Sequence, residues 1–273
     1  MVEHCLVVGA GAAAFGFANA IREVGYQGRV TVVGAEPVPP YERPPLSKQY
    51  LLGKKAESEL LFRPVAFYEE RAIGLVLGDA VEEIDLERRV ARTRAGREIG
   101  FDQLVLATGA VPNRLPVPGA DLPGVFVLRS LEDARGVRAA LSSTQCVVVI
   151  GGGFIGCEVA ASARTLGKQV ALVETLPVLL GRALGETIGA AITRVHERAG
   201  VQLYLGRKVI ALEGRERVER VLLDDGTSLP AEAVVVGIGV RPAVPAIRGE
   251  LTIEDGVVVD ATCAASAPGV WAA

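Results

Sequence analysis

The sequence predicts an α/β protein made of two copies of one strand–helix–strand plan. Half of its 273 residues are hydrophobic, only 22% are charged and 32 are glycine, which supports a large core and excludes a disordered or collagen-like chain. Two apolar runs, at 4–8 and 146–150, are each followed by a glycine-rich turn and a helical pattern. Both runs lack alternation, as is typical of parallel strands that are buried on both faces.

The first half of the chain places its elements in the order of a βαβ unit. After the strand at 4–8, a helical pattern extends to about residue 24, and a second apolar run occupies 29–33. Short strands are expected at 75–77, 81–84 and 104–107, with an exposed hairpin that turns at Ala95-Gly96.

The second half repeats this order. Residues 111–124 hold four prolines and are interpreted as a connection between domains. A helix to about residue 166, a strand at 169–173, a hairpin that turns at Asp225-Gly226 and a strand at 233–236 follow the second glycine-rich turn, and short strands are expected at 251–253 and 257–259. The predicted domain parts are therefore 1–111, 112–236 and 237–273.

Charge and cysteine usage exclude several classes of protein. The net charge is −3 and no segment gathers Lys and Arg, so we expect no nucleic-acid partner. The apolar start of the chain contains glycines and lacks a basic leader, so we expect neither a signal peptide nor a membrane span. The cysteines, at 5, 146, 157 and 263, are far apart and lack the spacing of a metal site. We therefore expect them to be buried apolar side chains of a cytoplasmic protein.

The first glycine-rich turn has the pattern G-x-G-x-x-A, from Gly9 to Ala14. Glycines here let the backbone approach a pyrophosphate, which would face the unpaired N–H groups of the helix N-terminus. Glu36 follows the second strand and is placed to accept hydrogen bonds from ribose hydroxyls. The alternative is a tight turn whose glycines serve only packing. The order of the elements, strand, turn, helix, strand and then an acid, favours a dinucleotide site.

The second turn, from Gly151 to Gly156, is a full G-x-G-x-x-G, and Glu174 follows its second strand. That carboxylate would bind the adenosine 2′-hydroxyl of NADH and repel the 2′-phosphate of NADPH. No Arg directly follows Glu174 to neutralise a 2′-phosphate, so NADH is favoured over NADPH. Phe154 could press on a flavin or nicotinamide, although we expect it to serve packing. Two dinucleotide sites in one chain indicate hydride transfer from a nicotinamide to a flavin, but spacing alone does not tell which site holds which.

The segment PYERPPLSK, residues 40–48, is stiffened by its prolines and contains the cations Arg43 and Lys48. It follows shortly after Glu36, the acid of the first βαβ unit, so these cations are expected near whatever that unit binds. With it, the chain resembles the family of FAD- and NADH-dependent ferredoxin reductases of aromatic-ring dioxygenase systems, which are related to putidaredoxin and rubredoxin reductases. The stretches LVLATGAVPNRLPVPG, LRSLEDA, VVIGGGFIGCEVAASARTLGKQVALVE, VVVGIGVRP and DGVVVD extend this likeness along nearly the whole chain.

The resemblance implies two Rossmann-like domains of the glutathione-reductase-like type. The NADH-binding domain, 112–236, would be inserted into an FAD-binding domain made of 1–111 and 237–273. Relatives continue with a Gly-Asp pair that binds the flavin side chain and with a third, C-terminal domain. The resemblance therefore implies a chain that lacks this third domain.

The resemblance also assigns cofactor-binding residues. For FAD these are Gly9, Gly11, Ala13, Ala14, Glu36, Arg43, Pro44, Lys48, Val81 (through its backbone), Thr108, Gly109 and Arg129. For NADH they are Gly151, Gly153, Ile155, Gly156, Glu158, Glu174 and Gly237.

Lys48 and Glu158 are the implied catalytic residues, and they are expected to pair with each other. A cation near the flavin would stabilise its reduced form, and the carboxylate would balance that cation when the flavin is oxidised. The alternative is that both are solvated surface charges. His4 and His196, the only histidines, are not expected to be catalytic.

The implied activity is electron transfer from NADH through FAD to the [2Fe-2S] ferredoxin of an aromatic-ring-hydroxylating dioxygenase. No cysteine stands where disulfide reductases of this architecture carry their redox pair, which favours one-electron delivery over thiol chemistry. Two alternatives stay open. The acceptor could be rubredoxin, monodehydroascorbate or a quinone, or the chain could be an NADH-binding module without activity.

Overall fold

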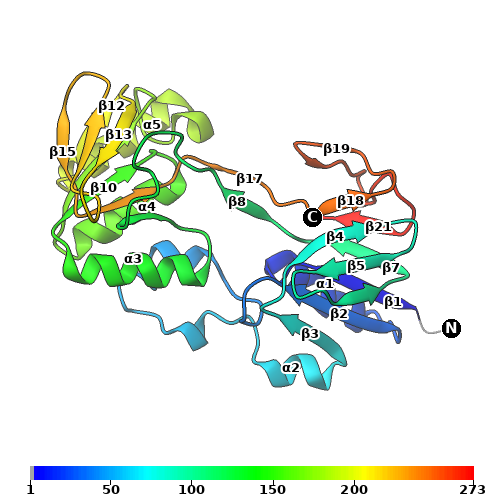
Figure 1. Ribbon diagram of the computed structural model, residues 1–273. Coiled ribbons are helices and arrows are strands. Elements are labelled where there is room, and N and C mark those ends of the chain that lie inside the picture. Colours follow the sequence, from blue (N-terminus) through cyan, green and yellow to red (C-terminus); the bar gives the residue numbers. More distant parts are fainter. Residues whose placement is uncertain (1–2) are drawn as a thin grey trace. The chain divides into compact units, whose positions relative to one another are not determined.

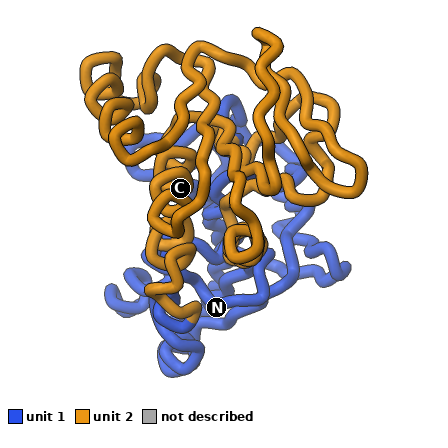
Figure 2. Tube along the Cα trace, turned by 90° about the vertical axis from the view of Figure 1, so that its left-hand side faces the viewer, with its two compact units in different colours: residues 1–42, 58–111, 241–273 blue, residues 43–57, 112–240 orange. Residues whose placement is uncertain are grey.

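The computed structural model describes residues 3–273, which form two compact units (Figures 1 and 2). Within the described residues, unit 1 comprises 3–42, Ser58–Val111 and Arg241–Ala273, and unit 2 comprises Arg43–Glu57 and Pro112–Val240. Unit 1 is therefore interrupted twice, because residues 43–57 pack with unit 2 although they precede most of unit 1 in the chain. The sequence pattern had placed them within 1–111.

Unit 1 is built on a five-stranded parallel sheet with the order β21-β7-β1-β2-β3. Its strands are β1 (His4–Val8), β2 (Arg29–Gly34), β3 (Ile73–Leu77), β7 (Gln103–Leu106) and β21 (Val270–Ala272). The first four were predicted from their apolar runs, whereas β21 was not. Its three residues, Val-Trp-Ala, follow Pro268-Gly269 and are too few to show a period.

Both faces of this sheet are covered, which explains why its central strand has no alternation. Cys5 and Val7 pack towards α1 (Ala12–Glu23) and α2 (Val65–Glu70), while Leu6 and Val8 pack towards a second sheet, which has both parallel and antiparallel strand pairs. That second sheet contains β4 (Val81–Asp85), β5 (Val90–Thr93), β6 (Glu98–Gly100) and β18 (Ala246–Arg248). The hairpin β5–β6 was expected to be exposed, but Ala91 and Ile99 are buried in the core.

Unit 2 repeats the plan with the sheet order β12-β11-β10-β16-β9. Its strands are β9 (Val125–Val127), β10 (Cys146–Ile150), β11 (Gln169–Glu174), β12 (Gln202–Leu205) and β16 (Ala233–Val236), and its helices are α3 (Leu131–Ser143), α4 (Phe154–Thr165) and α5 (Gly181–Arg198). One face of the sheet packs on the antiparallel strands β13 (Val209–Glu213), β14 (Arg220–Leu223) and β15 (Ser228–Pro230). The predicted turn at Asp225-Gly226 joins β14 to β15.

The remaining elements are short. They are the 3-10 helices η1 (Pro44–Ser47) and η2 (Glu57–Glu59) and the strands β8 (Ala110–Pro112), β17 (Val240–Pro242), β19 (Ile253–Glu254) and β20 (Gly256–Val257). The connecting segments β8 and β17 pair with each other. The hairpin β19–β20 replaces the longer strands that were expected at 251–253 and 257–259. Pro44 at the first position of η1 has a backbone φ that favours a helical start.

The cysteines are only partly as expected. Cys5 and Cys157 are buried, Cys146 is half-buried and Cys263 is exposed. The prediction of a buried side chain is therefore wrong for Cys263, which sits in a turn with a φ of 62°.

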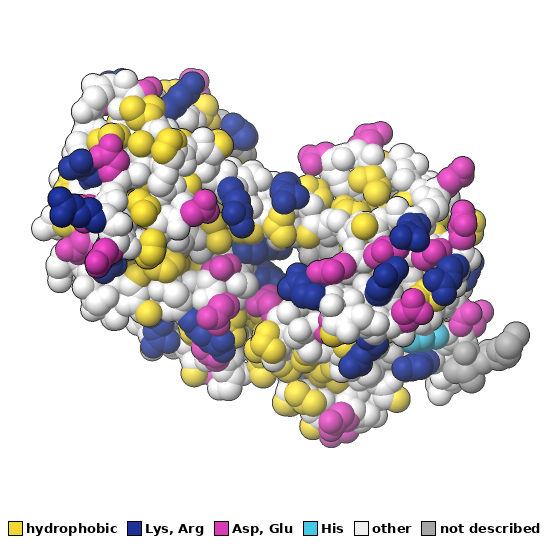
Figure 3. All heavy atoms as spheres, viewed as in Figure 1, with side chains coloured by type: hydrophobic (Ala, Val, Ile, Leu, Met, Phe, Trp, Pro, Cys, Tyr) yellow, Lys and Arg dark blue, Asp and Glu magenta, His cyan; other side chains and the backbone are white. Residues whose placement is uncertain are grey.

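On the face shown in Figure 3, basic and acidic side chains are mixed. None of the helices within residues 3–273 has both the length and the apolar character that crossing a bilayer requires.

Candidate functional site

In unit 1, the first glycine-rich turn forms a cradle at the N-terminus of α1. Gly9 has a φ of +114°, and a Cβ on it would lie 2.0 Å from the Ala107 carbonyl oxygen, so glycine is required where this turn meets the end of β7. Gly11 is the N-cap of α1, and apart from its chain neighbours no described atom lies within 4 Å of the place a Cβ would take. Ala14 is fully buried against the sheet. These are the roles of tight turn, ligand approach and helix packing in a dinucleotide cradle.

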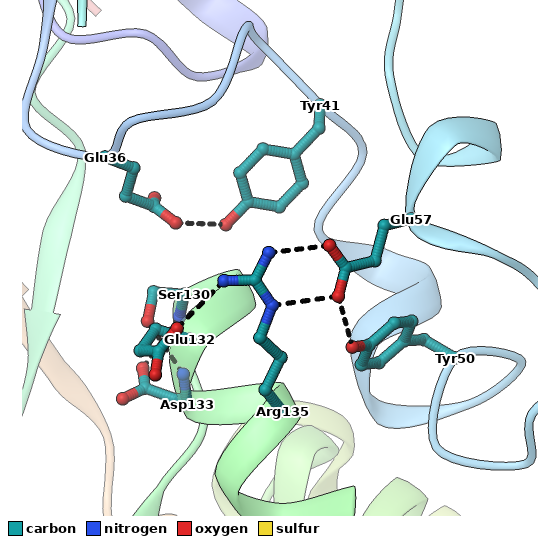
Figure 4. A network of polar contacts seen from close by, with 8 residues as sticks. All are labelled: Glu36, Tyr41, Tyr50, Glu57, Ser130, Glu132, Asp133 and Arg135. Carbon is teal, nitrogen blue, oxygen red and sulfur yellow. Dashed lines mark hydrogen bonds and ion pairs between the residues drawn. The ribbon is translucent and has the colours of Figure 1, made fainter. Parts of the chain in front are cut away.

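The other predicted residues of unit 1 lie around this carboxyl edge of the sheet. The Tyr41 hydroxyl donates to Glu36 Oε2 at 2.8 Å and so orients the carboxylate (Figure 4). The Gly78 amide donates to the Glu36 carbonyl at 3.0 Å, which brings the loop before Val81 beside the end of β2. Thr108 lies two residues after the end of β7, with its amide beside Gly9.

In unit 2, a cavity of about 560 Å³ opens where β10, β11 and β16 end. Gly151, Gly153, Glu174 and Gly237 line it, as predicted for nucleotide contacts. The carboxyl ends of parallel strands are where open α/β sheets bind ligands, and the volume is in the range of ligand pockets. Ile155, Gly156 and Glu158, which were also predicted as NADH contacts, do not line this cavity.

The three motif glycines of the second turn, Gly151, Gly153 and Gly156, have distinct roles. A Cβ on Gly151, whose φ is +104°, would lie 2.4 Å from the Gly237 carbonyl oxygen. A Cβ on Gly156 would lie 1.9 Å from the Gly151 carbonyl oxygen, so this glycine lets α4 approach the strand end. Gly153, the N-cap of α4, has open space within residues 3–273 where its Cβ would be. Only this middle glycine leaves room for a ligand rather than for protein.

Glu174 is held at the cavity by its own backbone surroundings. Its Oε2 accepts from the Gly152 amide at 2.5 Å, and its Oε1 accepts from the Leu176 amide at 2.8 Å and from the Thr175 hydroxyl at 2.9 Å. The carboxylate is therefore fixed at the carboxyl end of β11. Hydroxyl groups of a ribose can replace some of these donors.

Three cations on the cavity wall were missed by the sequence analysis. Arg182, Arg207 and Lys208 line the cavity together with Glu174. Arg207 and Lys208 follow β12, the parallel neighbour of β11, so the strand order could have indicated them. No pattern in the sequence indicates that Arg182, which lies in α5, reaches the cavity. Arg207 Nε also binds Asp225 Oδ2 at 3.0 Å. In the sequence, a positive charge was sought only at the residue directly after Glu174. The structure places three positive charges on the cavity wall from other parts of the chain.

Phe154 is exposed to 56% at the start of α4 and lines the cavity. The expectation that it serves packing is therefore wrong. Position 154 begins α4 directly after the N-cap Gly153, at the mouth of the cavity rather than in the part of α4 that packs on the sheet. The alternative, contact of this ring with a bound cofactor, stays a prediction.

The expected pair of Lys48 and Glu158 is present in unit 2. Lys48 Nζ lies 2.8 Å from Glu158 Oε1, and the two side chains are 41% and 30% exposed. The prediction that they pair is confirmed, while their catalytic role stays a prediction, because both side chains are partly solvated as the alternative of surface charges also requires. Arg43 Nη1 donates to the Arg129 carbonyl at 2.6 Å, so two more predicted residues lie together.

The segment that carries Lys48 is bound to α3 by a polar network (Figure 4). Arg135 binds both oxygens of Glu57, with Nε–Oε1 and Nη2–Oε2 distances of 2.8 and 2.6 Å, and the Tyr50 hydroxyl donates to Glu57 Oε1 at 2.9 Å. The hydrogen bond from Arg135 is the main reason that the pKa of Glu57 falls from 4.5 to about 2. No local pattern predicted this network.

The start of α3, which presents Arg135, is itself fixed by a capping box. The Asp133 amide donates to the Ser130 hydroxyl at 3.1 Å, and the Ser130 amide donates to Asp133 Oδ2 at 2.8 Å.

Burial shifts the pKa values of the histidines and of the two buried cysteines. It lowers the pKa of His4 and of His196, which favours the neutral imidazole. Burial raises the pKa of the Cys5 and Cys157 thiols to about 11, which disfavours the reactive thiolate.

The sequence model of the pyridine nucleotide-disulphide oxidoreductase family matches residues 3–273. The chain is 40% identical to a ferredoxin–NAD(P)(+) reductase of Sphingomonas sp, over 98% of this chain and 65% of the relative. It is 37% identical to the rubredoxin-NAD(+) reductase of Ectopseudomonas oleovorans, over 98% and 70% respectively. It is 38% identical to the biphenyl dioxygenase system ferredoxin–NAD(+) reductase component of Paraburkholderia xenovorans strain LB400, over 100% and 67%.

Among solved structures, the chain is similar to the ferredoxin reductase for the CYP199A2 system from Rhodopseudomonas palustris. The TM-score is 0.93 at 38% identity, over 99% of this chain and 67% of that one. Across these proteins the chain spans between 65% and 70% of each relative's length.

Proposed function

The chain belongs to the pyridine nucleotide-disulphide oxidoreductase family, and from this membership we propose that it is an NADH-dependent flavoprotein reductase of the cytoplasm. Its electrons pass from NADH through FAD to a small iron–sulfur protein, the [2Fe-2S] ferredoxin of an aromatic-ring-hydroxylating dioxygenase. One observation carries the proposal above the others: each unit has its own glycine cradle at the carboxyl edge of its own parallel sheet. One chain is thereby equipped for two dinucleotides.

The cradle of unit 1 fits the FAD pyrophosphate. Gly11 has open space beside it and caps α1, so the free amides of the helix N-terminus can face a diphosphate. Bound FAD supplies the chemistry of accepting a hydride and releasing its electrons one at a time. The residues proposed to hold FAD are Gly9, Gly11, Ala13, Ala14, Glu36, Arg43, Pro44, Lys48, Val81, Thr108, Gly109 and Arg129.

The cavity of unit 2 fits NADH. The α4 N-terminus at Gly153 faces a pyrophosphate in the same manner, and Glu174 is oriented for the adenosine ribose. The residues proposed to contact NADH are Gly151, Gly153, Ile155, Gly156, Glu158, Glu174 and Gly237.

Lys48 and Glu158 are the proposed catalytic pair. The two charges cancel each other while they are in contact, and their partial exposure leaves both accessible to a ligand. When negative charge develops beside it, the Lys48 ammonium stabilises that charge, while Glu158 neutralises the ammonium in the resting state.

The acceptor is proposed from the chemistry and the names of the relatives. Two of the relatives above are named as ferredoxin reductases and one as a rubredoxin reductase. Both kinds of name describe delivery of electrons to a small iron protein, and the high thiol pKa of Cys5 and Cys157 gives no support to a thiol route.

Purification and an acceptor panel test the proposal. We expect a yellow protein that oxidises NADH fastest with a [2Fe-2S] ferredoxin as acceptor, compared with rubredoxin, monodehydroascorbate and a quinone. Fastest turnover with a non-iron acceptor would overturn the ferredoxin assignment. A colourless protein that binds NADH and takes up no FAD would overturn the reductase assignment and leave a nucleotide-binding module.

A further inference from the structure

Glu158 is bound by two neighbouring residues of one segment, not by Lys48 alone. The Ser47 hydroxyl donates a short hydrogen bond to Glu158 Oε2, while Lys48 Nζ donates to Oε1 at 2.8 Å. Ser47 is the last residue of η1 and Lys48 is its C-cap, so consecutive residues engage the two oxygens of one carboxylate.

The three side chains differ in how firmly they are held. Ser47 is 1% exposed, whereas the Lys48 and Glu158 side chains are 41% and 30% exposed. A lysine is a point charge on a flexible four-carbon stem, so a carboxylate bound only by Lys48 would follow its movements. A buried hydroxyl with a single rotatable bond has no such freedom and holds the carboxylate from its protein side.

The backbone of Ser47 is anchored on the same helix. The Ser162 hydroxyl donates to the Ser47 carbonyl at 2.7 Å, and Ser162 is 4% exposed. Ser162 lies four residues after Glu158 in α4, so the two residues share one face of the helix. The helix therefore binds Ser47 twice, once at its carbonyl and once at its hydroxyl.

From this network we propose that Ser47 is a positioning residue for the catalytic pair. Its hydroxyl holds Oε2 of Glu158, which fixes the plane of the carboxylate so that Oε1 faces Lys48. The position of the Lys48 ammonium is then set by Glu158, and Glu158 in turn by Ser47. This inference rests on the proposed function of Lys48 and Glu158.

The first test measures the network without any cofactor. Urea unfolding of the FAD-free chain is compared for wild type, Ser47→Ala, Glu158→Ala and the double variant. A hydrogen bond to a charged group predicts that the double variant is more stable than additivity allows, by about tenfold in the unfolding equilibrium constant. Additive effects of the two changes would overturn the proposal.

The second test uses the FAD-loaded protein with a matched control. Thr144→Val removes a buried hydroxyl that donates to the Ala140 carbonyl at 2.9 Å, and among the described residues no hydrogen bond joins this hydroxyl to Ser47 or to either member of the pair. We expect Ser47→Ala to slow the single-turnover reduction of FAD by NADH about tenfold with KM for NADH nearly unchanged, and to shift the flavin midpoint potential. Thr144→Val should lower stability and leave rate and potential unchanged, and Ser47→Thr should restore the rate.

Two results separate this inference from the proposed function. Wild-type protein that neither binds FAD nor oxidises NADH would overturn the proposed function itself. Active wild type with an equally active Ser47→Ala, or with Thr144→Val as slow as Ser47→Ala, would overturn the role of Ser47 alone.

Discussion

Lys48 and Glu158 lie 2.8 Å apart although 110 residues separate them in the chain. Lys48 follows η1 in the segment 43–57, and Glu158 lies in the first half of α4. Both residues belong to unit 2, so the segment that interrupts unit 1 brings the cation to the carboxylate within one compact body.

Replacement of Lys48 tests the charge of the pair. We expect Lys48→Ala to slow hydride transfer from NADH to FAD by about 100-fold, because a group that meets developing charge in the transition state is worth about 3 kcal/mol. Anaerobic stopped-flow absorbance of the flavin measures this step. Lys54→Ala, an exposed lysine of the same segment, is the control and should keep the wild-type rate. Equal rates for both variants would show that Lys48 has no catalytic part.

The glycines of the second turn predict two opposite phenotypes. Gly151→Ala places a Cβ 2.4 Å from the Gly237 carbonyl oxygen at a φ of +104°, so it should destabilise the protein by about 1–3 kcal/mol. Gly153→Ala meets open space within the described residues and should leave stability within about 0.5 kcal/mol while it weakens NADH binding. Urea unfolding and NADH titration measure the two effects. Unaltered NADH affinity in Gly153→Ala would contradict the cradle.

Glu174 should control the choice of nucleotide. Glu174→Ala removes the ribose acceptor, so we expect KM for NADH to rise about tenfold. The ratio of kcat/KM for NADPH to that for NADH should rise as well, because Arg182, Arg207 and Lys208 remain on the wall of the cavity. Glu186→Gln, an exposed position of α5 outside the cavity lining, is the control. An unchanged preference in Glu174→Ala would place nucleotide selection elsewhere.

The pair of Glu57 and Arg135 predicts a pH dependence of stability. The pKa of Glu57 falls from 4.5 to about 2, mainly through its hydrogen bonds with Arg135, so the folded state favours the ionised carboxylate. The stabilisation is complete above pH 4.5 and is lost as the pH falls towards 2. Both side chains are more than 40% exposed, so solvent screening limits it to about 1 kcal/mol.

Glu57→Gln provides the measurement. Urea unfolding should show wild type to be more stable than Glu57→Gln at pH 7, with a smaller difference at pH 3. A difference that stays constant between these two pH values would mean that Glu57 does not titrate through its bond with Arg135. Arg135→Gln should give the same pattern.

Elements with local signals were predictable. The turns at Gly9 and Gly151, with the strand before and the helix after each, follow from short-range turn chemistry and from apolar runs buried on both faces. The pair of Lys48 and Glu158 was predicted only through the resemblance to a family, because no local period connects positions 48 and 158.

The sequence by itself determined both βαβ units, their glycine cradles and the acids that follow their second strands, since each depends on residues close together in the chain. The tertiary structure alone decided that residues 43–57 pack with unit 2, that Arg182, Arg207 and Phe154 line the cavity, and that Ser47 binds Glu158. These features depend on hydrogen bonds and packing between segments far apart in the chain. Such contacts form only after the strand order has been set, and they leave no period in the sequence.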